Sequence, residues 1–242
     1  METYVVRLWL PDRPGALGAV TSRIGAVRGS VVGIEILERG AGRAIDELVV
    51  ELPADDLVEL LIHEIGQVDG VDVEFIEPIA GAVHDPRLDA LETAAVLVGA
   101  PTPEDLLEAL CTHARRTIGA TWASVVDLED GEVRAGDGPA PAPAWLAAFV
   151  EGTRLMHHGE SGGPDDVVWA PLPASGYALL LGRTGTAFRA LERRHVAALA
   201  RIADTRFRDL RRARSQALHP SVGSTAESFR RTRSSLVSAR RP

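Results

Sequence analysis

The sequence contains no lysine, one cysteine and few aromatic side chains, and each shortage excludes a class of function. All 26 basic residues are arginine. A phosphate-loop NTPase requires a lysine in its glycine-rich loop, and a pyridoxal enzyme requires one for its Schiff base, so neither activity fits this chain. Because Cys111 is the single cysteine, no disulfide can form within the chain.

Long apolar runs are also missing, and the charge is unevenly distributed. The apolar stretches are far shorter than the roughly 20 residues of a membrane-spanning helix. The chain enters a predicted strand without the basic segment and apolar core of a signal peptide. These features favour a cytoplasmic protein that makes no membrane contact.

The net charge is −8, but residues 211–242 hold eight arginines and one glutamate, or +7, so residues 1–210 carry −15.

This charge distribution bears on possible partners. An acidic body argues against a nucleic-acid-binding surface, whereas the basic end suits an acidic partner. At 242 residues the chain is long enough for two domains with their own hydrophobic cores. We predict an α+β protein with domains over residues 1–80 and 86–210. Residues 211–242, rich in arginine and serine, are expected to form a disordered tail.

The first domain shows a complete pattern of strands and helices. Alternating apolar residues predict strands over 4–10, 31–37, 45–52 and 71–79, and helical spacing predicts helices over 17–27 and 54–65. The resulting order, βαββαβ, predicts a ferredoxin-like four-stranded antiparallel sheet with two helices on one face.

The turn between the first strand and the first helix, Pro11 to Gly18, gives the strongest functional signal. A strand that runs through a tight turn into a helix leaves backbone N–H groups unpaired, and these suit an anion such as a carboxylate. Gly15 lets a ligand approach the backbone, and Pro14 presets the turn. A structural interpretation stays open, because an aspartate such as Asp12 before a helix is common for capping alone.

The sequence Asp12-Arg13-Pro14-Gly15-Ala16-Leu17, the helix after it and the strand start Gly33-Ile34-Glu35-Ile36 resemble an ACT domain, a regulatory amino-acid-binding module. The resemblance implies a ligand between two such domains, held by Asp12, Arg13, Pro14, Gly15, Ala16, Leu17, Gly33 and Ile34. Many effector-binding members carry asparagine near the start of the second strand, where this sequence has Val32-Gly33. A dimerisation unit without a ligand therefore remains an alternative. Exposed edges of such a sheet favour pairing between two copies.

The second domain is predicted to begin with a helix over 86–98, which carries the apolar stripe Leu88, Leu91, Ala95 and Val98. A second helix begins at the capping sequence Thr102-Pro103. A hairpin over 122–135, a short helix over 145–150, strands over 167–172 and 177–182, and a long helix over 188–210 follow. This order resembles a GAF domain, a sensor module. The resemblance implies pairing of terminal helices between subunits and a pocket near Trp145, Phe149, Met156, His157, His158 and Trp169. Core packing is the alternative for the three aromatic residues.

The sequence contains fragments of catalytic motifs, but the elements and residues around them do not match those of the corresponding enzymes. Gly159 to Gly163 match G-x-S-x-G around Ser161, but a polar loop precedes the serine and Pro164 follows, so the strand–turn–helix of a hydrolase is missing. His63-Glu64 lacks the second histidine of a zinc-protease helix, because Gln67 stands there. Cys111 lies on an apolar helical stripe and is expected to be a core thiol. We therefore expect no catalytic residue, metal site or cofactor.

Together these patterns predict a non-catalytic regulatory protein, cytoplasmic and homodimeric. Its ACT-like domain would bind an amino acid or a similar small metabolite at the dimer interface, and it would act allosterically on a protein partner. A regulatory subunit of a biosynthetic enzyme and a structural dimerisation module without a ligand remain the alternatives.

Overall fold

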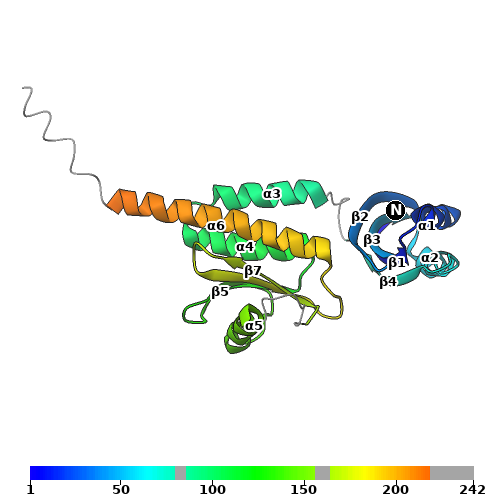
Figure 1. Ribbon diagram of the computed structural model, residues 1–242. Coiled ribbons are helices and arrows are strands. Elements are labelled where there is room, and N and C mark those ends of the chain that lie inside the picture. Colours follow the sequence, from blue (N-terminus) through cyan, green and yellow to red (C-terminus); the bar gives the residue numbers. More distant parts are fainter. Residues whose placement is uncertain (80–85, 156–163, 219–242) are drawn as a thin grey trace, which may run out of the picture.

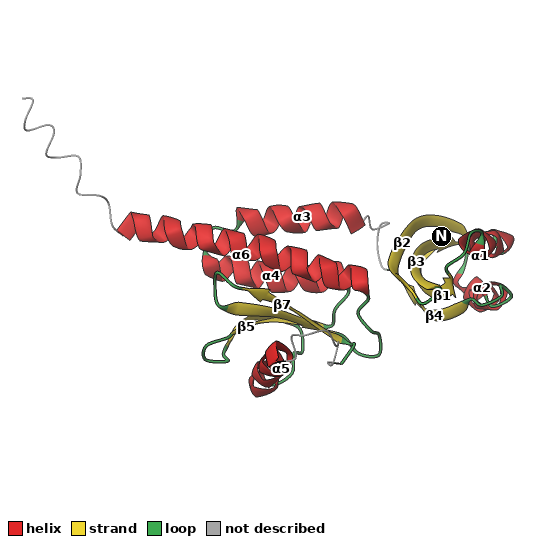
Figure 2. Cartoon of the chain, in the orientation of Figure 1, coloured by secondary structure: helices red, strands yellow, loops and turns green. Residues whose placement is uncertain are grey.

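The structure of the protein, a computed structural model, describes residues 1–79, 86–155 and 164–218 (Figure 1). The chain forms two α+β units, each built on its own four-stranded antiparallel sheet (Figure 2). The strand order is β2-β3-β1-β4 in the first sheet and β6-β5-β8-β7 in the second. The predicted fold class is therefore confirmed. Within the described ranges, no helix combines the length and the apolar character needed to cross a bilayer.

The first unit has the predicted ferredoxin-like order. Its elements are β1 (Glu2–Pro11), α1 (Ala16–Ala26), β2 (Ser30–Gly40), β3 (Arg43–Leu52), the 3-10 turn η1 (Asp55–Leu57), α2 (Val58–Ile65) and β4 (Asp72–Pro78). The prediction of one continuous helix over 54–65 was wrong in its first turn, which is 3-10. There the carboxylate of Asp55 accepts a 2.6 Å hydrogen bond from the hydroxyl of Tyr4 on β1.

Helices α1 and α2 cover one face of the first sheet, on the side away from the second unit (Figure 1). Alternate side chains of β1 and β3 point toward these helices, as the period of a strand requires. They form one buried cluster with the apolar stripes of both helices, including Val6, Leu8, Leu48, Val20, Ile24, Leu61 and Ile65. The remaining face of the sheet, which we call the open face, carries Arg7 and Glu47 on paired strands.

The second unit contains the predicted elements in the predicted order. They are α3 (Pro86–Gly99), α4 (Pro103–Ile118), β5 (Trp122–Asp127), β6 (Val133–Asp137), α5 (Pro143–Leu155), β7 (Val167–Leu172), β8 (Tyr177–Gly182) and α6 (Ala190–Leu218). The predicted cap of α4 is confirmed, because Thr102 Oγ1 accepts the amide N–H of Asp105 at 3.1 Å. Residues 211–218 were assigned to the tail and are in fact helical. They continue α6 with exposed arginines, which are good helix formers and favourable near a helix C-terminus.

Two apolar clusters lie on opposite faces of the second sheet. Helices α4 and α6 cover one face, with α3 packed on the outside of these two helices, and α5 covers the other face (Figure 2). On the α5 side, the indole of Trp122 lies directly against the backbone of Gly182. A Cβ atom on Gly182 would lie 2.3 Å from the ring carbons of Trp122, so only glycine fits there.

This contact gives a stability prediction. Gly182→Ala should lower the free energy of unfolding by about 1–3 kcal/mol, because the new methyl group overpacks the Trp122 ring. Gly152→Ala in α5 is the matched control, since no atom lies within 4 Å of its Cβ position. That substitution should raise stability by about 0.5–1 kcal/mol. Urea unfolding of both variants measures the difference, and equal effects would contradict this description of the α5 side.

Candidate functional site

The turn between β1 and α1 exposes backbone N–H groups at the start of the helix. Gly15 occupies the N-cap position with φ 86° and ψ −13°, and no side chain in residues 1–79, 86–155 or 164–218 caps the helix. Among the described residues, the amides of Gly15, Leu17 and Gly18 have no hydrogen-bond acceptor. The structure therefore does not support the alternative that Asp12 serves as the helix cap. The turn presents donors that a bound anion can accept.

The turn itself is held by backbone hydrogen bonds. The amide of Asp12 donates to the Gly42 carbonyl at 2.9 Å, and the amide of Arg13 donates to the Pro11 carbonyl at 2.8 Å. The side chains of Asp12 and Arg13 are exposed, and Asp12 Oδ1 lies 4.0 Å from Arg39 Nε. Pro14 and Gly15 are exposed, Leu17 is half-buried, and Ala16 is buried in the domain core.

The two predicted halves of the ACT-like site do not meet within one chain. Strand pairing places Ile34 level with Leu48 and Val6, four residues before Leu10, the second-to-last residue of β1. At about 3.3 Å per residue this is about 13 Å along the sheet, and β3 lies between β1 and β2. Gly33 and Ile34 therefore lie away from the turn of their own chain. A site that uses both halves needs a second copy.

Strand β2 provides an exposed edge for that second copy. It lies at one end of the sheet, opposite β4. Ile34 and Ile36 point to the same side as α1 and α2, because they pair with residues of that face, yet 51% and 39% of their surfaces are exposed. An edge strand with free backbone groups and exposed isoleucines favours pairing with another strand.

The described residues of the predicted GAF-like pocket pack together on the α5 side. Leu146, Val150 and Trp122 are buried there, and Phe149 and Trp169 pack against them. Trp145 is exposed and stacks on Phe149 with ring centroids 5.3 Å apart. The core interpretation fits Phe149 and Trp169, while Trp145 covers the cluster from outside. Met156, His157, His158 and Ser161 lie outside the described residues.

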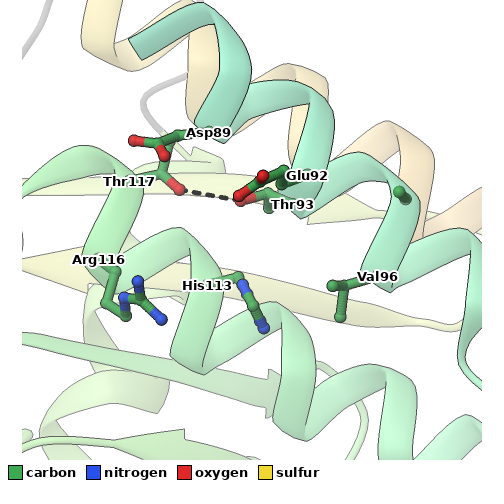
Figure 3. A pocket seen from close by; sticks show the side chains of 8 residues that line it. Asp89, Glu92, Thr93, Val96, His113, Arg116 and Thr117 are labelled. Atoms are coloured by element: carbon green, nitrogen blue, oxygen red, sulfur yellow. Dashed lines mark hydrogen bonds between the residues drawn. The ribbon is translucent and has the colours of Figure 1, made fainter. Parts of the chain in front are cut away.

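A groove between α3 and α4 was not predicted from the sequence. Its volume is about 530 Å³. Figure 3 shows the acidic side chains of Asp89 and Glu92 on α3, and the basic side chains of His113 and Arg116 on α4. Thr93 and Thr117 form a 3.0 Å hydrogen bond between the two helices. The groove arises from the pairing of two helices, so neither helix alone carries a signal for it.

The single cysteine, Cys111, is buried in the core of the second unit. Burial, with the negative charge of Asp137 adding to it, raises the pKa of the Cys111 thiol to about 12. The thiolate is the reactive form, so this cysteine is inert. In residues 1–79, 86–155 and 164–218, no group of three or more histidine, cysteine, aspartate or glutamate residues could hold a metal ion.

No family model and no curated protein matches the chain. The ACT domain of GTP pyrophosphokinase from Chlorobium tepidum is a similar solved structure, with 18% identity over 33% of this chain and 100% of that chain, at a TM-score of 0.27. The chromophore-binding domain of a bacteriophytochrome from R. palustris matches 87% of this chain and 94% of its own, with 10% identity and a TM-score of 0.38. A formyltetrahydrofolate deformylase from Pseudomonas putida matches 40% of this chain and 38% of its own, with 17% identity and a TM-score of 0.27.

The raised pKa of Cys111 gives a direct test of its burial. The folded protein at pH 8 should react with a thiol-specific disulfide reagent orders of magnitude more slowly than the protein unfolded in guanidinium chloride, because little thiolate forms and the sulfur is enclosed. Absorbance of the released chromophore measures both rates. A stoichiometric reaction within seconds in the folded state would contradict the assignment.

Proposed function

We propose that this protein is a non-catalytic regulator that binds a small metabolite bearing a carboxylate, with an amino acid as the expected class. The single observation that carries this proposal is the exposed turn whose amides at Gly15, Leu17 and Gly18 find no acceptor in the part of the chain that the structure describes. A carboxylate has enough lone pairs to accept several N–H donors at once. It also gains from the positive end of the helix dipole.

The side chains around the turn support an anionic ligand group. Arg13 is exposed beside the free amides and has no ion pair among the described residues. Asp12 lies on the same turn, where it can meet the ammonium group of an amino acid. Gly15 leaves open space beside its backbone, with no atom within 4 Å of its Cβ position. Such a turn suits a small zwitterion.

The proposed binding unit is a homodimer formed through β2. Pairing of two β2 edges would bury Ile34 and Ile36 of both copies and bring Gly33 of one copy toward the turn of the other. The second unit offers a further dimer surface on α3. Its predicted stripe, Leu88, Leu91, Ala95 and Val98, is exposed, and Val98 lines a groove of about 570 Å³ along α6.

Calorimetric titration of the purified protein with each of the twenty amino acids tests the metabolite. One or a few should bind, and Gly15→Val should abolish that binding, because a β-branched residue cannot hold φ 86° without strain. Gly176→Val is the matched control: Gly176 also has a positive φ, 78°, and open space around it, but it lies in the turn between β7 and β8. Both variants should lose about 1–3 kcal/mol of stability, and the control should keep its affinity.

Flat titrations with all twenty amino acids on folded protein would remove the amino-acid proposal. Equal loss of binding in both glycine variants would instead show that the turn at Gly15 is not the site. A dimer that forms normally but binds nothing would support the alternative of a structural dimerisation module.

Analytical ultracentrifugation tests the dimer. Ile34→Lys should weaken self-association tenfold or more, because a charge would be buried at the centre of the paired edges. Leu60→Lys is the control, since Leu60 is similarly exposed, at 44%, but lies on α2. A wild-type protein that sediments as a monomer, or equal weakening by both variants, would contradict pairing through β2.

A further inference from the structure

The open face of the first sheet meets the start of α6. Figure 1 places the second unit on the side of the sheet opposite α1 and α2. Ionic contacts cross between the units: Arg7 on β1 binds Glu192 on α6, and Arg189 binds Glu74 on β4. A third contact also crosses, because the backbone N–H of Ala190 donates to the side-chain carboxylate of Glu38 on β2 at 3.3 Å.

Arg7 is the central residue of this contact. It is 4% exposed, and its guanidinium lies between a carboxylate of its own sheet and a carboxylate of the other unit. Its Nη2 is 2.7 Å from Glu47 Oε2 and 3.1 Å from Glu192 Oε1. The Cζ atom of Arg7 lies over the ring of Phe75 on β4, 4.9 Å from the ring centroid. Loss of one partner from such a buried pair is strongly destabilising, so Arg7 ties the two units together.

Glu192 links Arg7 to the start of α6. Its carboxylate accepts two hydrogen bonds from Arg183, at 2.7 and 2.8 Å, and the amide of Arg189 at 2.6 Å. The last bond places Glu192 as a cap for the first turn of the helix. Burial opposes ionisation of Glu192, but the arginines and the amide outweigh it, and the pKa of this carboxyl is lowered. The same charged group therefore serves the sheet and the helix start.

A second bridge fixes the orientation of the helix start. Arg189 Nη2 binds both carboxylate oxygens of Glu74, at 2.7 and 2.9 Å. The guanidinium also lies 4.9 Å from the ring of Trp9, whose indole N–H donates to Glu74 at 3.1 Å. Two bridges at separate points on the sheet resist rotation of α6 about either one.

Strand β2 connects this contact to the exposed edge. Glu38, which accepts the Ala190 amide, lies on the same strand as Gly33 and Ile34. The segment between them is bounded by irregular pairings with β3, at Val31/Gly33 and at Ile36/Glu38. Such bulges interrupt a ladder locally. A shift of residues 33–36 can therefore be taken up at the irregularity directly beside Glu38, without opening the whole β2–β3 pair.

We propose that this contact couples the two units, so that a shift in the position of the β2 edge shifts the first turn of α6 with it. We call the contact the coupling joint. An occupant of the β2 edge is then reported at α6, a helix that runs the length of the second unit. The proposed function enters only in naming this occupant, which would be a second copy of the chain. The joint itself is a property of the single chain.

The first test measures the joint through cooperativity of unfolding. The wild-type chain should unfold in one calorimetric transition, and Arg7→Met should split it into two, because the units lose the buried Arg7–Glu192 link and keep the less buried Arg189–Glu74 bridge. Arg23→Met is the control, since Arg23 pairs with Glu64 on the exposed helical side, within the first unit. Two transitions in the wild-type chain, or one transition in Arg7→Met, would overturn the proposal.

The second test displaces β2 by a substitution and measures hydrogen exchange at the start of α6, without any metabolite. A Cβ atom on Gly33 would lie 3.2 Å from Val49 Cγ2 on β3, so Gly33→Val displaces the edge. Hydrogen exchange at amides 190–195 should then accelerate about fivefold or more, and adding Arg7→Met to Gly33→Val should remove this response. Gly40→Val, on the same strand with open space around it, is the matched control.

Equal exchange rates at amides 190–195 in Gly33→Val and Gly40→Val would overturn the coupling. So would a response of the same size with and without Arg7→Met. Neither test depends on the titrations or on sedimentation, so a failure of the joint and a failure of the proposed function give different results.

Discussion

The arrangement of the two units depends on one buried ionic contact, Arg7 between Glu47 and Glu192. A guanidinium that is 4% exposed is costly to bury, and its attraction to two carboxylates has to offset the desolvation. The contact therefore favours one relative position of the units, in which both carboxylates reach Arg7. Apolar surfaces of the same area would tolerate sliding, whereas hydrogen bonds of 2.7 and 3.1 Å do not.

This contact also explains why the open face of the first sheet carries charged side chains beside apolar ones such as Val5, Ile45 and Val49. Alternate positions on β1 and β3 carry Arg7, Trp9 and Glu47 on that face. In a free ferredoxin-like unit such a face would be solvated. Here it receives the charged first turn of α6, with Arg189 over Trp9 and Glu192 beside Arg7. The open face is a surface for the second unit rather than an unused side of the sheet.

Most of the fold could be predicted from local patterns, because the apolar periods of strands and helices can be recognised within a few neighbouring residues. The strands over 167–172 and 177–182 and the capped start of α4 are examples. The joint could not be predicted in this way. Arg7 and Glu192 are 185 residues apart, and each alone resembles an ordinary solvated charge.

The candidate site also combines features that neighbouring residues predict with features that depend on residues far apart in the sequence. The turn at Gly15 could be identified from Asp12 to Leu17, because a strand, a glycine and a helix start follow one another directly. Its free amides required the structure, since a capping side chain at Asp12 was equally compatible with the sequence. The separation of Gly33 from that turn required the strand order, in which β3 lies between the two parts.

The joint limits how a second copy can approach the first unit. Helices α1 and α2 occupy one face of its sheet, and α6 with its charged first turn occupies the other, so stacking of sheets face to face is blocked on both sides. The two edges remain, and they differ. Strand β2 spans 11 residues and exposes Ile34 and Ile36, whereas β4 spans 7 residues, and its Glu74 is already bound to Arg189. An edge that is longer and exposes apolar side chains is the better surface for pairing. Because β2 also carries Glu38, which binds the first turn of α6, the strand suited to meet another copy is the one that contacts the helix start.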